Sequence, residues 1–299
     1  MRQRKFRITL LDIVVTVLLA AAIVYIVYRI REGLHYKWNW AAIPQYLFRY
    51  DEKTMTLVPN LLVQGLVMTI RLSIWGTIIA TLIGLIMGLF RVSHSLFRRL
   101  IGRTYVELVR NIPPIVLIFI FYYFISNQIL VLFDVDAFVS ERAPWFRSLF
   151  GVLCAPVSQC SAFISALITL AVFEGAYITE IVRAGIQSIP KGQYEAAYSL
   201  GLSRWQTMRH IVLPQATRII LPPLAGQFIS TIKDSAIVSV ISIQELTFQG
   251  MELMSATYLT FEVWITITAL YLVLTLSLSL GLARLEKIWD QKMWGQVSV

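Results

Sequence analysis

Charged residues are scarce in this sequence of 299 residues: they make up 14% of it, whereas hydrophobic residues make up 57%. A soluble domain averages about 25% charged residues, so the composition excludes an ordinary soluble chain. The apolar residues gather in runs of about 20, which is the length of a membrane-spanning helix. The net charge of +9 would suit nucleic acid, but the basic residues lie between these runs, where they favour one membrane orientation and contact lipid headgroups.

The motifs of several enzyme classes are also missing. The sequence has no GxxxxGK[ST] phosphate-binding loop, so we expect no ATP hydrolysis by this chain, and it has no HExxH or GxSxG motif. Its three histidines, His35, His94 and His210, stand on different segments. The two cysteines, Cys154 and Cys160, either pair in an oxidising compartment or serve as small apolar fillers, and we prefer the second interpretation.

Six apolar segments predict six transmembrane helices and hence an all-α, polytopic membrane helix bundle. The first segment, 8–28, is longer than the apolar core of about 7–15 residues in a signal peptide. We therefore expect it to stay uncleaved, and cleavage is the alternative. An aromatic segment, 29–60, follows it and is expected at the outer interface. The other five helices are expected at about 61–90, 104–133, 160–181, 219–243 and 263–283.

Lysine and arginine are distributed unequally between these helices. Sixteen of them lie in the N-terminal tail, in 91–103, in 183–218 and in the C-terminal tail, and seven lie in the segments on the opposite side. Cytoplasmic segments carry an excess of lysine and arginine. The distribution therefore predicts that both termini and the segment 188–214 are cytoplasmic.

Small residues recur at every fourth position of the second predicted helix. Residues four apart lie on one helix face, and small residues there let another helix approach closely. We predict a packing face without a ligand site, formed by Gly76, Ala80, Gly84 and Gly88.

Two adjacent charges, Lys233 and Asp234, stand near the middle of the stretch between Arg218 and Glu245. Charges at that depth are costly and normally face a bundle interior or an aqueous cavity. Neighbours on a helix diverge by about 100°, so each charge needs a partner on another helix or in a ligand. Glu174, in the preceding span, is the candidate partner of Lys233.

Two interpretations of this polar centre stay open. In the first, separate cationic and anionic points line the path of a zwitterionic molecule such as an α-amino acid. In the second, a buried network of ion pairs only locks the helix. Gln227, Thr231 and Tyr177 are weaker candidates for further hydrogen bonds, because serine and threonine in spans usually bond their own backbone.

The segment 188–214 is a polar, basic island between two long apolar runs. Ser188 and Pro190 are helix-entry signals, and a short helix is predicted at 193–200. Gly201 fits the end of that helix, where a left-handed residue is needed. The sequence therefore predicts an ordered structure here.

A second short helix is predicted at 203–212, and Pro214, which lacks an N–H, is expected to mark the turn into the next span. We name the bent pair of helices in 188–214 the elbow. Such order indicates that the elbow docks on a partner at the membrane surface. A structured turn without a partner is the alternative.

Residues of the elbow resemble a known signature. Glu195-Ala196-Ala197, followed by Gly201 and by Ile211-Val212-Leu213-Pro214, is similar to the EAA motif of ABC importer permeases. The surroundings resemble the polar amino acid permeases (histidine, glutamate, glutamine, arginine or opine type). The matching segments are Glu174-Gly175-Ala176-Tyr177, 180–186, 189–193, 213–216 and Lys233-Asp234-Ser235. The resemblance covers roughly 60–290.

The resemblance implies a multi-pass permease subunit in a bacterial inner membrane, which imports polar amino acids by alternating access. It implies that the elbow couples this movement to a separate ATPase. Its coupling residues would be Glu195, Ala196, Ala197, Gly201, Arg204, Arg209 and Pro214. The expected partners are two ATPase copies that hold ATP and Mg²⁺, a second permease that is identical or homologous, an extracytoplasmic amino-acid-binding protein and membrane lipid. No nucleic acid is expected, and no cofactor, metal or enzymatic activity is expected in this chain.

The expected organisation has three parts. An extra span with an outer linker occupies 1–58, a permease domain with the elbow occupies 59–290, and a tail occupies 291–299. An ion-gradient-driven secondary transporter is the main alternative, since it would explain the membrane charges but not the ordered elbow. A membrane scaffold without transport activity is a further alternative.

Overall fold

The computed structural model describes residues 10–33, 36–53, 55–126, 128 and 135–294. It divides into two compact units, Met1–Trp40 and Ala41–Val299, each of which is described by itself. Helix α1, Leu10–Gly33, belongs to the first unit, and its apolar part, Leu10–Ile26, is shorter than a full membrane span. The predicted number of six spans is therefore not established.

Aromatic rings follow α1 in the first unit. Tyr36 packs edge-on against Trp38, and Trp38 stacks on Trp40 with 5.9 Å between the ring centroids. Rings of this kind favour the level of the lipid headgroups. The contacts hold with or without a membrane nearby, so the interfacial position of the aromatic segment stays a prediction.

The second unit begins with short elements and not with a loop. A 3-10 turn, η1 (Trp40–Ala42), and helix α2 (Ile43–Leu47) lead into strands β1 (Phe48–Asp51) and β2 (Thr56–Pro59). The strands pair antiparallel, with Phe48 opposite Pro59. The side chain of Asp51 accepts a hydrogen bond from the Lys53 N–H at 3.0 Å and so closes the turn. This hairpin corrects the prediction of a purely α-helical fold.

Four helices of the second unit have the length and composition of membrane spans, by those criteria alone. Each includes one of the predicted apolar segments. They are α3 (Leu61–Arg91), α9 (Cys160–Gln187, preceded by the 3-10 turn η3, Val157–Gln159), α12 (Leu213–Asp234, inside the helical run Arg204–Ile241) and α14 (Thr260–Trp294).

A fifth candidate span is broken. Helix α4 (Leu96–Asn111) and helix α5 (Pro114–Phe119, continued by the π-helix η2, Ile120–Ser126) meet at 113°. Pro113 and Pro114 lack an N–H, so the helical hydrogen-bond ladder stops there. The segment expected as one span at 104–133 is thus broken, and it starts earlier, since much of the basic segment 91–103 is helical. Residues 127 and 129–134 lie outside the described residues.

Two of the segments between the predicted spans contain short helices. The segment after the span at 104–133 holds α7 (Val135–Ser140) and α8 (Pro144–Leu153), and the segment after the span at 219–243 holds α13 (Leu246–Thr257). The hydrophobic residues of these helices are interrupted by polar ones too often for the helices to be interpreted as membrane spans. Cys154 and Cys160 do not form a disulfide, which agrees with the preferred interpretation of small fillers.

The small residues of α3 lie against α9. A Cβ added at Gly84 would lie 2.5 Å from Ile178 Cγ2, and one at Gly88 would lie 2.6 Å from Val182 Cγ1. Because residue numbers rise in the same direction on both helices, α3 and α9 are parallel. All four small residues, Gly76, Ala80, Gly84 and Gly88, are buried.

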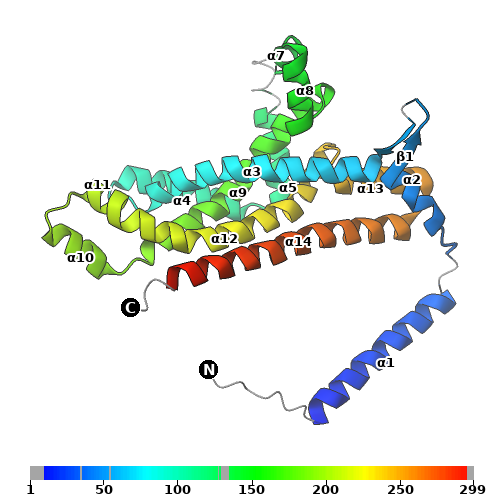
Figure 1. The fold of residues 1–299 in the computed structure, drawn as a ribbon, viewed down its shortest axis with the longest axis horizontal. Coiled ribbons are helices and arrows are strands. Elements are labelled where there is room, and N and C mark those ends of the chain that lie inside the picture. Colours follow the sequence, from blue (N-terminus) through cyan, green and yellow to red (C-terminus); the bar gives the residue numbers. More distant parts are fainter. Residues whose placement is uncertain (1–9, 34–35, 54, 127, 129–134, 295–299) are drawn as a thin grey trace. The chain divides into compact units, whose positions relative to one another are not determined.

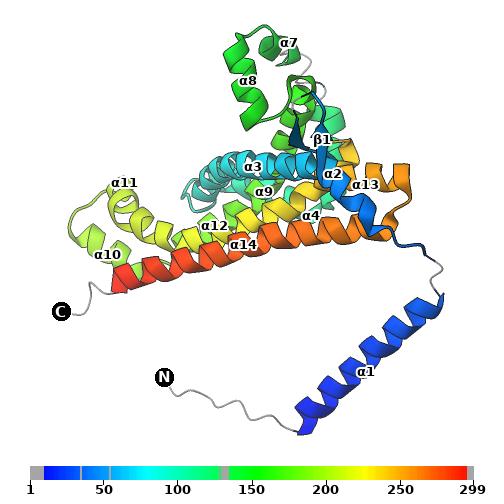
Figure 2. The ribbon, with the colours of Figure 1, turned by 45° about the vertical axis from the view of Figure 1, so that its right-hand side comes forward.

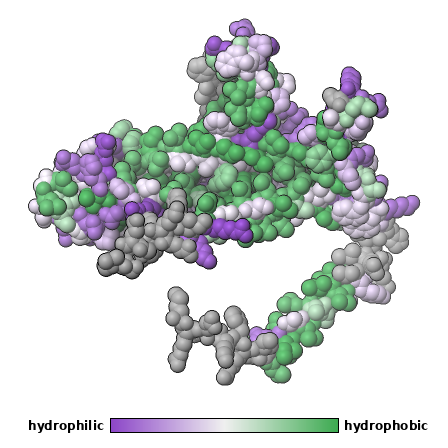
Figure 3. Space-filling view, in the orientation of Figure 1, coloured by the Kyte–Doolittle hydropathy of each residue, from purple (hydrophilic) through white to green (hydrophobic). Residues whose placement is uncertain are grey.

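Helix α12 runs antiparallel to α9. Gly185, near the end of α9, meets Ile220 near the start of α12, whereas Glu174 meets Gln227 further along. The elbow joins these two helices at one end of the bundle, where the turn from α3 to α4 also lies; the hairpin and α13 lie at the other end (Figures 1 and 2). Hydrophobic side chains cover most of the visible length of these helices, and hydrophilic ones gather around the elbow (Figure 3).

Candidate functional site

The first half of the elbow is helix α10, Lys191–Ser199. Gly201 follows it with φ +76°, a left-handed conformation that glycine adopts without a steric penalty. Its N–H donates to Tyr198 O at 3.0 Å, and the Leu202 N–H donates to Ala197 O at 3.1 Å. These bonds satisfy carbonyls that the end of a helix leaves open, so the sharp turn has a local cause.

Two predicted entry signals have other positions. Ser188 ends α9 and does not begin α10: its N–H donates to Ala184 O at 2.9 Å and its hydroxyl to Gly185 O at 2.8 Å. Pro190 stands just before the first residue of α10, where its carbonyl accepts from the Gln193 N–H at 3.0 Å. The short connection leaves Ser188 within reach of the last carbonyls of α9, and these take its hydrogen bonds.

The second half of the elbow begins with helix α11, Arg204–Thr207. Ser203 and Gln206 form a capping box, in which each side chain accepts from the other residue's N–H, at 3.3 Å and 2.8 Å. A π-helix, η4 (Met208–Val212), then leads directly into α12. Pro214 therefore does not mark a turn, because in the first turn of α12 its missing N–H is not needed.

The predicted coupling residues differ in exposure. Ala197 is buried, whereas the others lie on the surface: Glu195, Ala196, Gly201, Arg204, Arg209 and Pro214. Large apolar side chains accompany them, since Leu200 is 81% and Trp205 68% exposed. The elbow thus offers a surface of mixed apolar and charged side chains on a locally fixed backbone.

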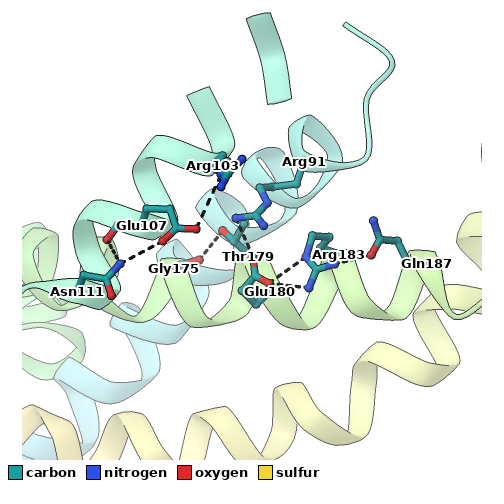
Figure 4. A network of polar contacts seen from close by, with 9 residues as sticks. All are labelled: Arg91, Arg103, Glu107, Asn111, Gly175, Thr179, Glu180, Arg183 and Gln187. Atoms are coloured by element: carbon teal, nitrogen blue, oxygen red, sulfur yellow. Dashed lines mark hydrogen bonds and ion pairs between the residues drawn. The ribbon is translucent and has the colours of Figure 1, made fainter. Parts of the chain in front are cut away.

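A network of ion pairs joins α3 and α9 near the elbow (Figure 4). Glu180 contacts Arg91 Nη1 at 3.0 Å through one carboxylate oxygen and Arg183 Nη2 at 2.8 Å through the other. Arg183 also donates to Gln187, and on α4 the side chain of Asn111 donates to Glu107. Sequence reasoning did not predict this network, because its partners lie almost ninety positions apart.

A second carboxylate on α9 has different neighbours. Glu174 is fully buried, and Gln227 Nε2 of α12 donates to its Oε2 at 2.6 Å. Thr231 and Asp234 of α12 approach the same group. Its Oε1 atom is buried without a hydrogen-bond partner among the described residues. The site thus brings together four of the predicted polar residues, with an excess of acceptors and no cation in contact.

The expected ion pair of Lys233 with Glu174 is not formed in the described residues. The side chain of Asp234 points toward Glu174. The side chain of Lys233 points in a different direction around α12 and is exposed. Tyr177 also lies apart from the cluster: the guanidinium of Arg110 lies over its ring at 5.2 Å. Neighbouring positions on a helix cannot share one face, which explains the separation of Lys233 from Asp234.

A further carboxylate, which is buried, was missed by sequence reasoning. Glu245 caps α13, accepting from the N–H groups of Thr247 at 2.8 Å and Phe248 at 2.7 Å and from the Tyr271 hydroxyl at 2.9 Å. The hydroxyl of Thr69 lies 3.4 Å away. Burial raises the pKa of Glu245 to about 7, although these donors oppose the shift. An acidic residue directly before an apolar helix is the sequence feature that indicates such a cap.

Comparison with known proteins assigns the class. Residues 80–294 match the family model described as binding-protein-dependent transport system inner membrane component. The chain therefore belongs to this family of transport-system membrane proteins.

Individual relatives are more specific. The chain is 34% identical over 227 residues to the glutamine transport system permease protein GlnP of Escherichia coli (strain K12), which covers 76% of this chain and 92% of the relative. It is 32% identical over 223 residues to the glutamate/aspartate import permease protein GltJ of the same organism, with 75% and 85% covered. These relatives agree with the recognised resemblance to polar amino acid permeases of ABC importers.

Solved structures show the same fold. A crystal structure described as an amino acid ABC transporter with histidines is 32% identical, with a TM-score of 0.64 over 84% of this chain and 99% of that one. An inward-facing structure of the MetNI methionine ABC transporter is 19% identical, with a TM-score of 0.57 over 76% and 95%. The second likeness concerns the fold alone.

Proposed function

We propose that this chain is the permease subunit of an ABC importer in a bacterial inner membrane and that it moves polar amino acids into the cytoplasm by alternating access. The observation that carries the proposal is the elbow, a capped and folded structure with Leu200 and Trp205 exposed at one end of the bundle. An apolar surface rimmed by charges is typical of a protein-binding site. In the proposal its partner is a separate ATPase.

Coupling follows from the geometry of the elbow. Gly201 and the buried Ala197 fix its shape, so a displacement of the partner moves it as a body. The charged side chains of Glu195 and Arg209, which lie outside the cavity beside the elbow, are available for ion pairs with the ATPase. ATP and Mg²⁺ bind to that ATPase in the proposal, and this chain supplies the movement of its membrane helices.

The buried cluster around Glu174 is the proposed contact for the amino acid. A zwitterion brings an ammonium group, which matches the unpartnered Oε1 of Glu174 and the carboxylate of Asp234. Lys233 is the proposed cation for the carboxylate of the amino acid. Because a free charge is costly inside a membrane, an arriving ammonium group stabilises the cluster more than it stabilises water-exposed acids.

The exposed Lys233 also supports a second permease subunit, identical or homologous. A charge in the middle of a span normally faces protein or an aqueous cavity, not lipid. A second subunit placed against this side of α12 would enclose such a cavity between the two. Two copies of the ATPase and an extracytoplasmic binding protein complete the proposed assembly.

Purification of the chain with its associated proteins, followed by reconstitution in liposomes, tests the proposal. We expect an ATPase and a soluble amino-acid-binding protein to co-purify, and uptake of radiolabelled glutamine, glutamate or histidine to require ATP on the ATPase side. Uptake that survives without ATP and follows a proton or sodium gradient would instead show a secondary transporter. A complex with no substrate-stimulated ATP hydrolysis would show a scaffold.

Substitutions in the elbow test the docking step separately. Leu200→Glu with Trp205→Glu places two charges on the proposed contact surface, and we expect the ATPase retained on the purified chain to fall at least tenfold, because buried hot-spot side chains each contribute about 2 kcal/mol or more. Leu57→Glu, on β2 at the other end, is the control, since Leu57 is 69% exposed. Equal retention by all three proteins would contradict docking at the elbow.

A further inference from the structure

An open cavity of about 840 Å³ lies between the elbow and the turn 92–95 that joins α3 to α4. Its volume is within the range of about 300–1,000 Å³ that is usual for small-molecule sites. No aspartate or glutamate lines it, although every residue around it is described. Its cationic lining consists of Arg91, Arg98, Arg99 and Arg204.

Most of this positive charge is not neutralised within the chain. Arg91 is held by Glu180 at 3.0 Å. Arg98, Arg99 and Arg204 are exposed and form no ion pair with any described residue. Three guanidinium groups around one cavity repel each other unless an anion enters, so the cavity favours an anionic ligand.

A buried hydroxyl in the wall points to the same ligand. Thr207, at the end of α11, is 1% exposed, and its Oγ1 has no hydrogen-bond partner among the described residues. Leaving a buried hydroxyl unpaired costs about 1–3 kcal/mol. An oxygen-rich group in the cavity, next to Thr207, would satisfy this hydroxyl as well as the arginines.

The surroundings of the arginines distinguish a lipid from a soluble anion. Arg98 and Arg99 lie on α4 next to Leu96 and Phe97, which are 62% and 72% exposed, and Trp205 lines the cavity as well. A helix that carries exposed apolar residues beside arginines is typical of the membrane interface. Apolar side chains beside the cavity offer a contact for acyl chains.

We propose that this cavity binds the phosphate of an anionic phospholipid headgroup. Arg98, Arg99 and Arg204 bind the phosphate oxygens, Thr207 donates its hydroxyl to one of them, and the acyl chains extend along Leu96 and Phe97. Basic pockets on the cytoplasmic side of membrane helices are suited to such headgroups; the cytoplasmic position of the elbow rests on the proposed function. A bound lipid would connect α4 to the elbow, so anionic lipid would also promote coupling.

Photo-crosslinking of the unaltered chain tests the site without any substitution. The purified chain is placed in liposomes of phosphatidylcholine that contain a trace of phosphatidylglycerol carrying a photoreactive headgroup, and labelled peptides are mapped by mass spectrometry. We expect labels in 91–99 and 198–208. Labels confined to other segments would overturn the proposal.

Variants measured by native mass spectrometry give the residue contributions. We expect the unaltered chain to retain phosphatidylglycerol at least tenfold better than phosphatidylcholine. The triple change Arg98→Gln, Arg99→Gln and Arg204→Gln should abolish that preference, and Thr207→Val should lower retention about fivefold. Arg103→Gln on α4 is the matched control and should change nothing, because Arg103 does not line the cavity.

Two further results would overturn the proposal. Displacement of phosphatidylglycerol by millimolar inorganic phosphate would identify a site for a free anion. Crosslinks from Thr207→Cys to the ATPase, together with loss of bound lipid when the ATPase is present, would assign the cavity to protein docking. The crosslinking uses the chain without ATPase or binding protein, so a failure to label the cavity would not contradict the proposed transport activity. Conversely, a chain that is inactive in transport can still bind lipid.

Discussion

Two glutamates of α9, Glu174 and Glu180, stand six residues apart on one helix and have opposite surroundings. Glu180 is partly exposed and is neutralised by Arg91 and Arg183 at 3.0 and 2.8 Å. Glu174 is fully buried and meets Gln227 and the neighbouring Asp234, and no cationic side chain of the described part of the chain forms an ion pair with it.

In the proposed function this difference separates a structural carboxylate from a ligand-binding one. The ion pair of Glu180 with two arginines ties α3 to α9. The carboxyl of Glu174 meets a second acid, Asp234, and in the proposal the ammonium group of an α-amino acid compensates this acidic pair. The predictions below test whether Glu180 serves the architecture and Glu174 the substrate contact.

The largest effect is expected for Glu174→Gln. The change removes the charge but keeps a polar group beside Gln227, so the fold should persist, while the contact to the ammonium group is lost. Truncating a buried charged contact costs about 2–5 kcal/mol, so uptake in liposomes should fall about 100-fold or more. Thermal unfolding should stay within about 1 °C of the unaltered chain. Unchanged uptake would assign Glu174 to architecture as well.

Glu245 adds to the comparison a buried carboxylate that accepts hydrogen bonds from several donors. Its pKa is raised to about 7 from 4.5, so the folded chain keeps a proton that the unfolded chain has lost. The free energy of unfolding of the unaltered chain should therefore fall, compared with that of Glu245→Gln, as pH rises from 4.5 through 7. Above that range the difference in free energy of unfolding between the two proteins should stay constant.

The free energy of unfolding is expected to fall by about 2 kcal/mol, compared with Glu245→Gln, between about pH 5 and pH 6.5. Chemical unfolding in detergent at a series of pH values measures it, with Glu252→Gln on the same helix as the control, because Glu252 is exposed. Parallel pH profiles for Glu245→Gln and the unaltered chain would contradict the raised pKa.

Gly84→Ala tests whether close packing of α3 on α9 places both glutamates. The added methyl would lie 2.5 Å from Ile178 Cγ2 and 3.1 Å from the Ile178 carbonyl carbon, so backbone must move. Overpacking of this kind costs about 1–2 kcal/mol, and a lowered unfolding temperature should accompany reduced uptake. Gly281→Ala in α14 is the matched control, since nothing lies within 4 Å of its added methyl.

The smallest effect is expected for Glu180→Gln. It leaves Arg91 and Arg183 without their carboxylate, but all three side chains are partly exposed to solvent. We expect a loss of about 1 kcal/mol, less than a fully buried pair would give, and uptake within about twofold of normal. A loss of uptake as large as that of Glu174→Gln, at unchanged stability, would remove the distinction between the two glutamates.

Local sequence signals predicted the elbow well. Gly201 takes the left-handed conformation and Ser203 caps the following helix, because both depend on residues within one turn. The turn predicted at Pro214 was wrong, since a proline is equally compatible with a first helical turn and with a break in a helix. Which of the two occurs depends on the π-helix before it.

Long-range partners were beyond the sequence. Glu174 stood as the candidate partner of Lys233, but the rotation of α12 against α9 turns Asp234 toward it. The angle of 113° between α4 and α5 likewise depends on packing, although the prolines fixed its position. Apolar runs gave the spans, but they carried no information on the hairpin, which short extended segments form by pairing with each other.

One uninterrupted helical run, Arg204–Ile241, extends from the elbow to the polar cluster. At about 1.5 Å per residue, roughly 35 Å separates Arg204 from Gln227 along this rod. Ile220 rests on Gly185 between those points and can serve as a fulcrum. A tilt imposed at the Arg204 end, 16 residues from Ile220, would then swing Asp234, 14 residues beyond it, the opposite way, if the helix holds rigid through Pro222 and Pro223.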